Sequence, residues 1–134
     1  CTEPPFGKIA VVDLKTRKIV WEKPLGTSRD SGPFNIPSQI PMPMGVPNTG
    51  GALTTQSGLV FIGATQEHAF RAFDINSGKK LWSARLPAGG NATPMSYISP
   101  KSGRQFVVVG AGGNAAVVTG ASDHIMAYAL PAAK

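Results

Sequence analysis

A hairpin pattern occurs twice in the chain and limits its fold more than any other feature. In VVDLKTRKIVW, residues 11–21, and in AFDINSGKKLW, residues 72–82, an Asp precedes a Trp by eight positions, with turn-forming residues between them. Each copy predicts a strand, a tight turn and a second strand that carries an inward-facing aromatic ring. A repeated unit of this kind indicates a repeat architecture, in which neighbouring units bury one another's faces.

The rest of the chain predicts an all-β fold built from short strands. Alternation and turn signals place strands at residues 8–14, 18–25, 52–55, 58–64, 69–75, 79–86, 92–99, 104–110 and 124–130. No window shows a helical period with capping residues. The segment HIMAYAL repeats the strand that precedes the Asp, but the chain then ends at PAAK without a closing Trp strand.

These units predict blades of a β-propeller, a fold whose last sheet is often completed from the other end of the chain. We expect residues 1–25 to end one blade, 26–51 to form a long Pro-rich loop, 52–86 to form a complete blade and 92–130 to form a last blade without its outer strand. A ring takes about four to eight blades, so this chain is too short for the whole molecule. The unpaired edge at 124–130 predicts self-association of the isolated chain.

The turns of the repeated hairpin predict a structural role for its marked residues. Asp13 and Asp74 are expected to accept backbone N–H bonds across their own turns. Gly78 supplies the positive φ that such a turn needs, whereas the first copy has Arg17 there and should be mildly strained. Trp21 and Trp82 are expected to cover the junction with a neighbouring sheet and to have no catalytic role.

Composition excludes several classes of function. The net charge is +6, but Lys and Arg are scattered and do not form a basic stripe interleaved with aromatics, so we expect no nucleic-acid partner. No window approaches the roughly 18 apolar residues of a membrane helix, and the start does not resemble a signal peptide. The single cysteine, Cys1, excludes an intramolecular disulfide. It either follows a cut in a longer protein or is the lipidated start of a bacterial lipoprotein.

The motif Ala72-x-Asp74-x-x-Ser77-Gly78-x-x-x-Trp82 resembles the tryptophan-docking motif of the quinoprotein dehydrogenases. These are eight-bladed propellers that hold pyrroloquinoline quinone, PQQ. The segments GGALTTQSGLVFIGATQEHAFRAFD, LPAGGNATPMSY and AYALP resemble the C-terminal end of the membrane-bound glucose and quinate/shikimate branch. The resemblance covers nearly the whole chain.

That resemblance implies an enzyme that oxidises a sugar or a cyclic polyol at the periplasmic face of the bacterial inner membrane. Electrons would pass through PQQ to ubiquinone, with Ca²⁺ or Mg²⁺ polarising the quinone carbonyl and an Asp acting as general base. In the family, that Asp and the main cofactor contacts lie in earlier blades. We therefore expect no catalytic residue in this chain and no activity from the chain alone.

Cofactor contact is expected where the long loop ends, directly before an inner strand. There Thr49 is followed by Gly50 and Gly51, whose lack of side chains would let backbone approach a flat ring system. The alternative is a surface loop without a role. The other connections at the same end of the sheets are residues 66–68, 87–91 and 112–123.

Two of these connections carry candidate substrate-site residues. Glu67 and His68 either orient substrate or cofactor or form an exposed pair without a role. The last connection is longer than its counterpart and is either a substrate wall, with Asn114 and Asp123 as its polar groups, or a tolerated insertion. Asn114 sits where glucose-oxidising members tend to carry a His.

No metal site is expected within this chain, because its two His residues are 56 positions apart and lack Cys or carboxylate partners at ligand spacing. A non-catalytic propeller scaffold, such as an outer-membrane assembly lipoprotein, is the alternative function. It would explain a lipidated Cys1, but it explains the Pro-rich loop less well.

Overall fold

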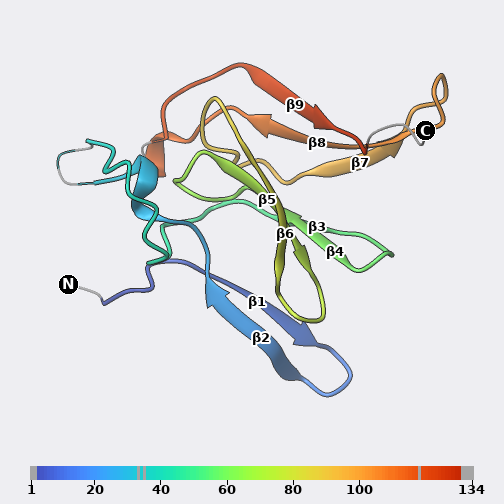
Figure 1. Ribbon diagram of the computed structural model, residues 1–134, viewed down its shortest axis with the longest axis horizontal. Coiled ribbons are helices and arrows are strands. Elements are labelled where there is room, and N and C mark those ends of the chain that lie inside the picture. Colours follow the sequence, from blue (N-terminus) through green and yellow to red (C-terminus); the bar gives the residue numbers. More distant parts are fainter. Residues whose placement is uncertain (1–2, 33, 35, 118, 131–134) are drawn as a thin grey trace.

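The computed structural model describes residues 3–32, 34, 36–117 and 119–130, so Cys1 and the closing PAAK lie outside the described residues. Its strands form three antiparallel sheets (Figure 1). The first sheet pairs β1 (Lys8–Asp13) with β2 (Lys18–Pro24). The second has the order β3 (Ala52–Thr54), β4 (Leu59–Ile62), β5 (Ala69–Asp74) and β6 (Lys80–Arg85). The third has β7 (Met95–Ile98), β8 (Gln105–Ala111) and β9 (His124–Tyr128). The prediction of an all-β chain is confirmed.

Within the described residues, two short 3₁₀ helices were not predicted. They are η1 (Ser28–Asp30) in the long loop and η3 (Ala115–Val117) in the connection between β8 and β9. Each has three residues, so neither is long enough to produce a helical period in the sequence.

In each sheet, strands that follow one another along the chain are also neighbours in space. Figure 1 shows the consequence of this meander: the tight hairpin turns lie toward one end of the molecule, and the longer connections lie toward the other. The connections at this second end are residues 25–51, 63–68, 86–94 and 112–123. Candidate residues from distant parts of the sequence are therefore carried to the same end.

The second sheet lies between the other two, and its strand β5 is buried on both faces. Phe73 belongs to a core cluster shared with Ile9 and Leu25 beside the first sheet. Phe70 belongs to a second cluster shared with Val107 and Val109 of the third sheet. Phe70 and Phe73 are an odd number of positions apart and so point to opposite faces of the strand. Burying each ring stabilises the fold by roughly 1.5–3 kcal/mol, which holds the three sheets in a stack.

Both copies of the repeated hairpin have the predicted turn chemistry. Asp13 Oδ1 accepts a hydrogen bond from the Lys15 N–H at 2.8 Å, and Asp74 Oδ1 accepts one from the Ser77 N–H at 2.7 Å. The bond from the Lys15 N–H holds the pKa of the Asp13 carboxyl below its usual value, and the bonds from the Ser77 hydroxyl and then the Ser77 N–H do the same for Asp74. Arg17 has a φ of 56°, the strained conformation expected there. Each hairpin also has a register shift, with Val20 and Leu81 as the unpaired extra residues of the second strands.

Both tryptophans lie at sheet junctions, as predicted. Trp21 Nε1 donates to the Ile75 carbonyl at 2.8 Å, and its ring lies against Gly78. A Cβ at Gly78, whose φ is 64°, would lie 2.7 Å from that ring, so glycine is required there for packing as well as for backbone conformation. Trp82 packs edge-to-face on Tyr128 of the third sheet, with ring centroids 5.0 Å apart.

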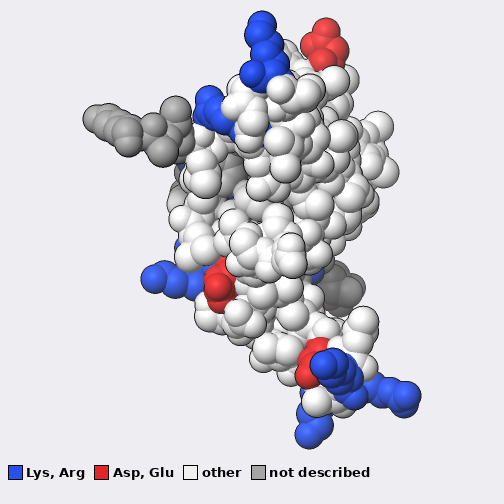
Figure 2. All heavy atoms as spheres, turned by 90° about the vertical axis from the view of Figure 1, so that its right-hand side faces the viewer, with Lys and Arg blue, Asp and Glu red and all other residues white. Residues whose placement is uncertain are grey.

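On one face of the molecule, charged side chains are scattered as the sequence predicted. On the face shown in Figure 2, Lys and Arg side chains lie in separate places with uncharged surface between them, and acidic residues lie among them. That face has no continuous basic stripe.

Candidate functional site

The long loop between β2 and β3 is tied to the second sheet at two points. Asp30 accepts hydrogen bonds from the two terminal guanidinium nitrogens of Arg85, Nη1 and Nη2, at 2.6 and 2.7 Å. It accepts a third from the His68 N–H at 2.9 Å. Glu67 forms a buried ion pair with Arg71 and accepts the Thr27 N–H at 2.7 Å. These contacts join loop residues to β5, to β6 and to the connection before β5. The start of the long loop is therefore fixed against the second sheet.

Asp30 is held in its charged form by these contacts. Burial alone would raise the pKa of its carboxyl, but the hydrogen bonds from Arg85 and the His68 N–H outweigh burial, and the pKa is lowered. The Arg85 pKa is raised in turn, mainly by its hydrogen bond to Asp30.

The loop ends at a cluster of three polar side chains from three different connections. Thr49 Oγ1 accepts hydrogen bonds from Asn91 Nδ2 at 3.1 Å and from Asn114 Nδ2 at 3.3 Å. The Thr49 N–H donates to the Ala64 carbonyl at 2.9 Å, which fixes the backbone beside the inner strands. Thr49 and Asn114 are 65 positions apart in sequence, and the structure brings these two predicted site residues together.

Asn91 is a member of this cluster that was not singled out from the sequence. Its Oδ1 is buried and has no hydrogen-bond partner among the described residues. A buried carbonyl oxygen normally has a partner, so this atom marks a place where a donor from a ligand could bind. The only sequence signal was its position at the end of GGN, in a connection already assigned to this end of the sheets.

The connection that carries Asn114 is held by hydrogen bonds within itself and by one to the connection 86–94. The Gly113 N–H donates to the Gly89 carbonyl at 3.0 Å, and the Asn114 N–H donates to Thr119 Oγ1 at 2.6 Å. Asn114 Oδ1 accepts the Ala116 N–H at 2.9 Å, at the start of η3. Its side-chain oxygen is thus engaged within the loop, while its NH₂ group faces Thr49.

The glycines after Thr49 are required by packing within the protein. A Cβ at Gly50 would lie 2.6 Å from the Asn91 carbonyl oxygen, and one at Gly51 would lie 2.4 Å from Thr93 Oγ1. The close approach that glycine permits is therefore between residues 50–51 and the connection 86–94. A direct cofactor contact by Gly50 and Gly51 stays a prediction.

The remaining candidates lie apart from the Thr49 cluster. Glu67 is only 7% exposed, so the alternative of an exposed pair is wrong for this residue. His68 is half-buried, and its backbone N–H binds Asp30. Asp123 is fully exposed, 3.6 Å from His124 Nδ1, and makes no contact with Asn114 among the interactions described. A role for Glu67, His68 or Asp123 in substrate binding stays a prediction.

The described part of the chain has no group of three or more His, Cys, Asp or Glu residues arranged to hold a metal ion. Within residues 3–130, leaving aside positions 33, 35 and 118, no helix is long and apolar enough to span a bilayer.

Stacked antiparallel sheets with their long connections gathered at one end are the arrangement of β-propeller blades. Comparison with known families makes this class specific. The model of the PQQ glucose/ethanol/alcohol dehydrogenase β-propeller domain matches residues 1–107. The chain belongs to this family, and the resemblance predicted from its motifs is confirmed.

Named relatives agree with this family. The chain is 51% identical, over 97% of its length, to the quinate/shikimate dehydrogenase (quinone) of Acinetobacter baylyi. It is 47% identical, over 98% of its length, to the quinoprotein glucose dehydrogenase of Escherichia coli K12. It covers only 16% of either relative. Among solved structures, a europium-containing methanol dehydrogenase is similar to this chain, with a TM-score of 0.56 and 27% sequence identity. The match covers 79% of this chain and 15% of the methanol dehydrogenase chain.

Proposed function

We propose that this chain forms the C-terminal blades of a PQQ-dependent dehydrogenase that oxidises a sugar or a cyclic polyol and passes the electrons to ubiquinone. The observation that carries the proposal is the cluster of Thr49, Asn91 and Asn114, in a chain about half identical to quinate and glucose dehydrogenases. The same relationship supports a location at the periplasmic face of the inner membrane. The general base and the Ca²⁺ or Mg²⁺ site would belong to other blades.

The residues of the cluster fit PQQ, a polar ring system that carries carboxylates and carbonyl oxygens. When bound, PQQ supplies the two-electron acceptor for oxidation of an alcohol. The Thr49 hydroxyl and the Asn91 amide supply hydrogen-bonding groups at the end of the loop, beside the inner strands. Thr49, together with the Gly50 backbone, would contact the cofactor, and the Asn91 amide would orient the Thr49 hydroxyl.

Asn114 is the residue that we assign to the substrate. Its amide is neutral and can donate a hydrogen bond to a substrate hydroxyl without titrating. A His at this position would change charge near neutral pH and would present a ring of different shape. We therefore infer that Asn114 influences which polyol is oxidised and has little effect on the chemical step.

The test is a set of variants in the full-length protein. Asn114→Ala and Asn114→His should change the order of kcat/KM values among glucose, quinate and glycerol. Loss of one hydrogen bond to a substrate hydroxyl should cost about 1–3 kcal/mol in transition-state binding. PQQ affinity, measured by titrating the apoprotein, should change little. Asn76→Ala is the matched control, because Asn76 is exposed in the β5–β6 turn at the opposite end.

An unchanged order of substrates in both Asn114 variants would refute the assignment of this residue. Absence of PQQ binding and of quinone reduction by the wild-type full-length protein would refute the proposed function as a whole.

A further inference from the structure

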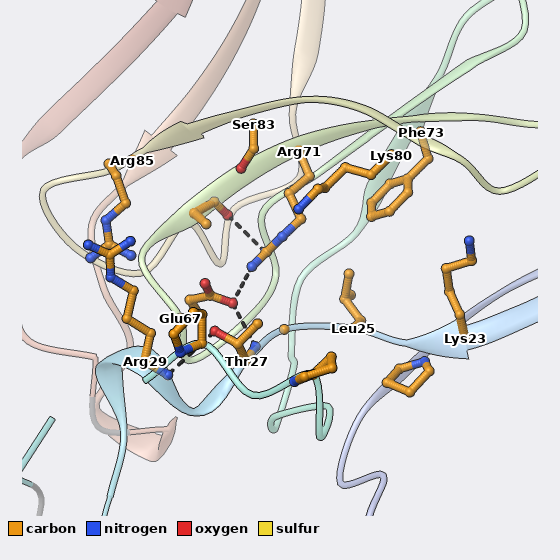
Figure 3. A pocket seen from close by; sticks show the side chains of 15 residues that line it. Lys23, Leu25, Thr27, Arg29, Glu67, Arg71, Phe73, Lys80, Ser83 and Arg85 are labelled. Carbon is orange, nitrogen blue, oxygen red and sulfur yellow. Dashed lines mark hydrogen bonds and ion pairs between the residues drawn. The ribbon is translucent and has the colours of Figure 1, made fainter. Parts of the chain in front are cut away.

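A groove with a strong excess of positive charge lies between the first and second sheets, away from the Thr49 cluster. It has a volume of about 450 Å³ and is lined by β2, the start of the long loop, β5 and β6. Five cationic side chains line it, against one carboxylate, Glu67. The five are Lys23, Arg29, Arg71, Lys80 and Arg85. Figure 3 shows Glu67, Thr27 and Arg71 meeting, with Arg29 and Arg85 to one side of them and Lys23 to the other.

Two of the five cations have carboxylate partners. Arg71 pairs with Glu67, and Arg85 pairs with Asp30 at 2.6 Å. The other three, Lys23, Arg29 and Lys80, form no ion pair with any described carboxylate. Lys23 instead donates to the neutral Gly78 carbonyl. The groove therefore keeps three cations whose charge no described acidic residue balances.

Several hydrogen-bond donors that line the groove also have no partner among the described residues. Neither the Arg29 guanidinium nor the Lys80 ammonium donates a hydrogen bond in the described structure, and the Ser83 hydroxyl makes none. Arg29, Lys80 and Ser83 are exposed, so water solvates them in the free protein, and the like charges around the recess repel each other only moderately. A bound anion would remove that repulsion and use these donors.

The groove suits a phosphate group better than a small monatomic anion. Arginine presents a planar fork of donors that matches phosphate oxygens, lysine adds a point charge, and a serine hydroxyl can donate a further bond. The opposite wall includes Pro41 and Pro43, whose fixed φ angles limit movement of the loop. Arg29 lies in the loop and Lys80 lies on β6, so an anion between them would join the loop to the sheet.

We propose that this inter-sheet groove binds a phosphate group, with Arg29 and Lys80 as its main ligands and Ser83 in support. Arg71 and Arg85 stay paired with their carboxylates, so the net positive charge of the groove comes from the other three cations. The phosphate can come from inorganic phosphate or from the headgroup of an anionic phospholipid, and the same side chains would bind either.

The test uses the purified full-length protein and two probes. Inorganic phosphate is titrated calorimetrically at constant ionic strength, with chloride as the competing anion. Mixed micelles containing phosphatidylglycerol are compared with micelles containing only phosphatidylcholine. Arg29→Gln and Lys80→Gln should each weaken binding of the effective probe about tenfold, as expected for losing one charge-assisted hydrogen bond. Lys15→Gln removes the same charge from the exposed β1–β2 turn and should leave binding unchanged.

Binding of inorganic phosphate that both groove variants weaken would support the proposal with the free ion as the source. Binding of phosphatidylglycerol alone, weakened by the same variants, would support it with a lipid headgroup as the source. The proposal is overturned if neither probe binds, or if Lys15→Gln weakens binding as much as the groove variants do. Thermal unfolding of each variant without probe shows whether the fold is intact.

Discussion

The attachment of the long loop through Asp30 provides the most direct quantitative test of the structure. Asp30→Ala removes a carboxylate whose side chain is 11% exposed and which accepts two hydrogen bonds from Arg85 and one from the His68 N–H. The matched control is Glu22→Ala. Glu22 pairs with Lys8 at 3.0 Å, but both of these side chains are about half exposed, at 47% and 48%.

The expected cost of Asp30→Ala has two parts. Leaving the partly buried His68 N–H without an acceptor should cost about 1 kcal/mol. Loss of the two-point pair with Arg85, whose side chain is 45% exposed, should cost about 1 kcal/mol more after allowance for solvent screening. We expect the free energy of unfolding to fall by about 2 kcal/mol in Asp30→Ala, and by less than about 1 kcal/mol in Glu22→Ala.

Urea unfolding of the full-length protein measures both values, because urea does not screen charges as guanidinium does.

The pH dependence of stability gives a second test. The pKa of Asp30 is lower in the folded protein than in the unfolded chain, where it is about 3.9. Its contribution to stability is therefore complete above the unfolded pKa and is lost as pH falls through the folded pKa. The difference between wild type and Asp30→Ala should shrink below about pH 4. Equal losses in Asp30→Ala and Glu22→Ala at neutral pH would refute the reasoning.

Three further substitutions test the packing and the turns, each by urea unfolding. Trp82→Ala removes the edge-to-face contacts with Tyr128 and should cost about 2–4 kcal/mol; a loss below about 1 kcal/mol would contradict its role at the sheet junction. Glu67→Gln leaves the buried Arg71 charge without its counter-ion and should cost about 3 kcal/mol, whereas a neutral result would show that water compensates that charge. Arg17→Gly should raise stability by up to about 1 kcal/mol, because its φ of 56° favours glycine; any loss would show that the turn is not strained.

Much of the fold could be predicted because its determinants are local. Alternating apolar residues place every strand to within a few residues, and the Asp at the end of β1 and of β5 predicts the turn that follows. The largest error is in β7, predicted at 92–99 and found at Met95–Ile98. Residues 92–94 include Pro94, which has no N–H to donate to a neighbouring strand, so pairing begins only after it.

The candidate site was predicted less completely, because its contacts join distant connections. Thr49 could be proposed from its position before an expected inner strand, and Asn114 from the extra length of the last connection and from the family resemblance. Asn91 could not, since an asparagine in a glycine-rich loop has the same sequence pattern whether it fills a turn or orients another side chain. The burial of Glu67 did leave a signal in the sequence. Arg71 follows it by four residues, an even number, so in an extended chain the two side chains point to the same face.

The contrast between the two ends of the sheets explains why function and stability should separate in this chain. At the hairpin end, Asp13 and Asp74 each bond within their own turn, so a substitution there changes one turn. At the other end, Thr49 is held by side chains from connections 86–94 and 112–123, which themselves depend on how the second and third sheets pack. A cavity made at Phe70, between those sheets, would let the third sheet shift relative to the second and move Asn114 relative to Thr49. Core substitutions on that side of β5 should therefore alter the geometry of the proposed site, while equally destabilising substitutions at Phe73, on the other side, should alter it less.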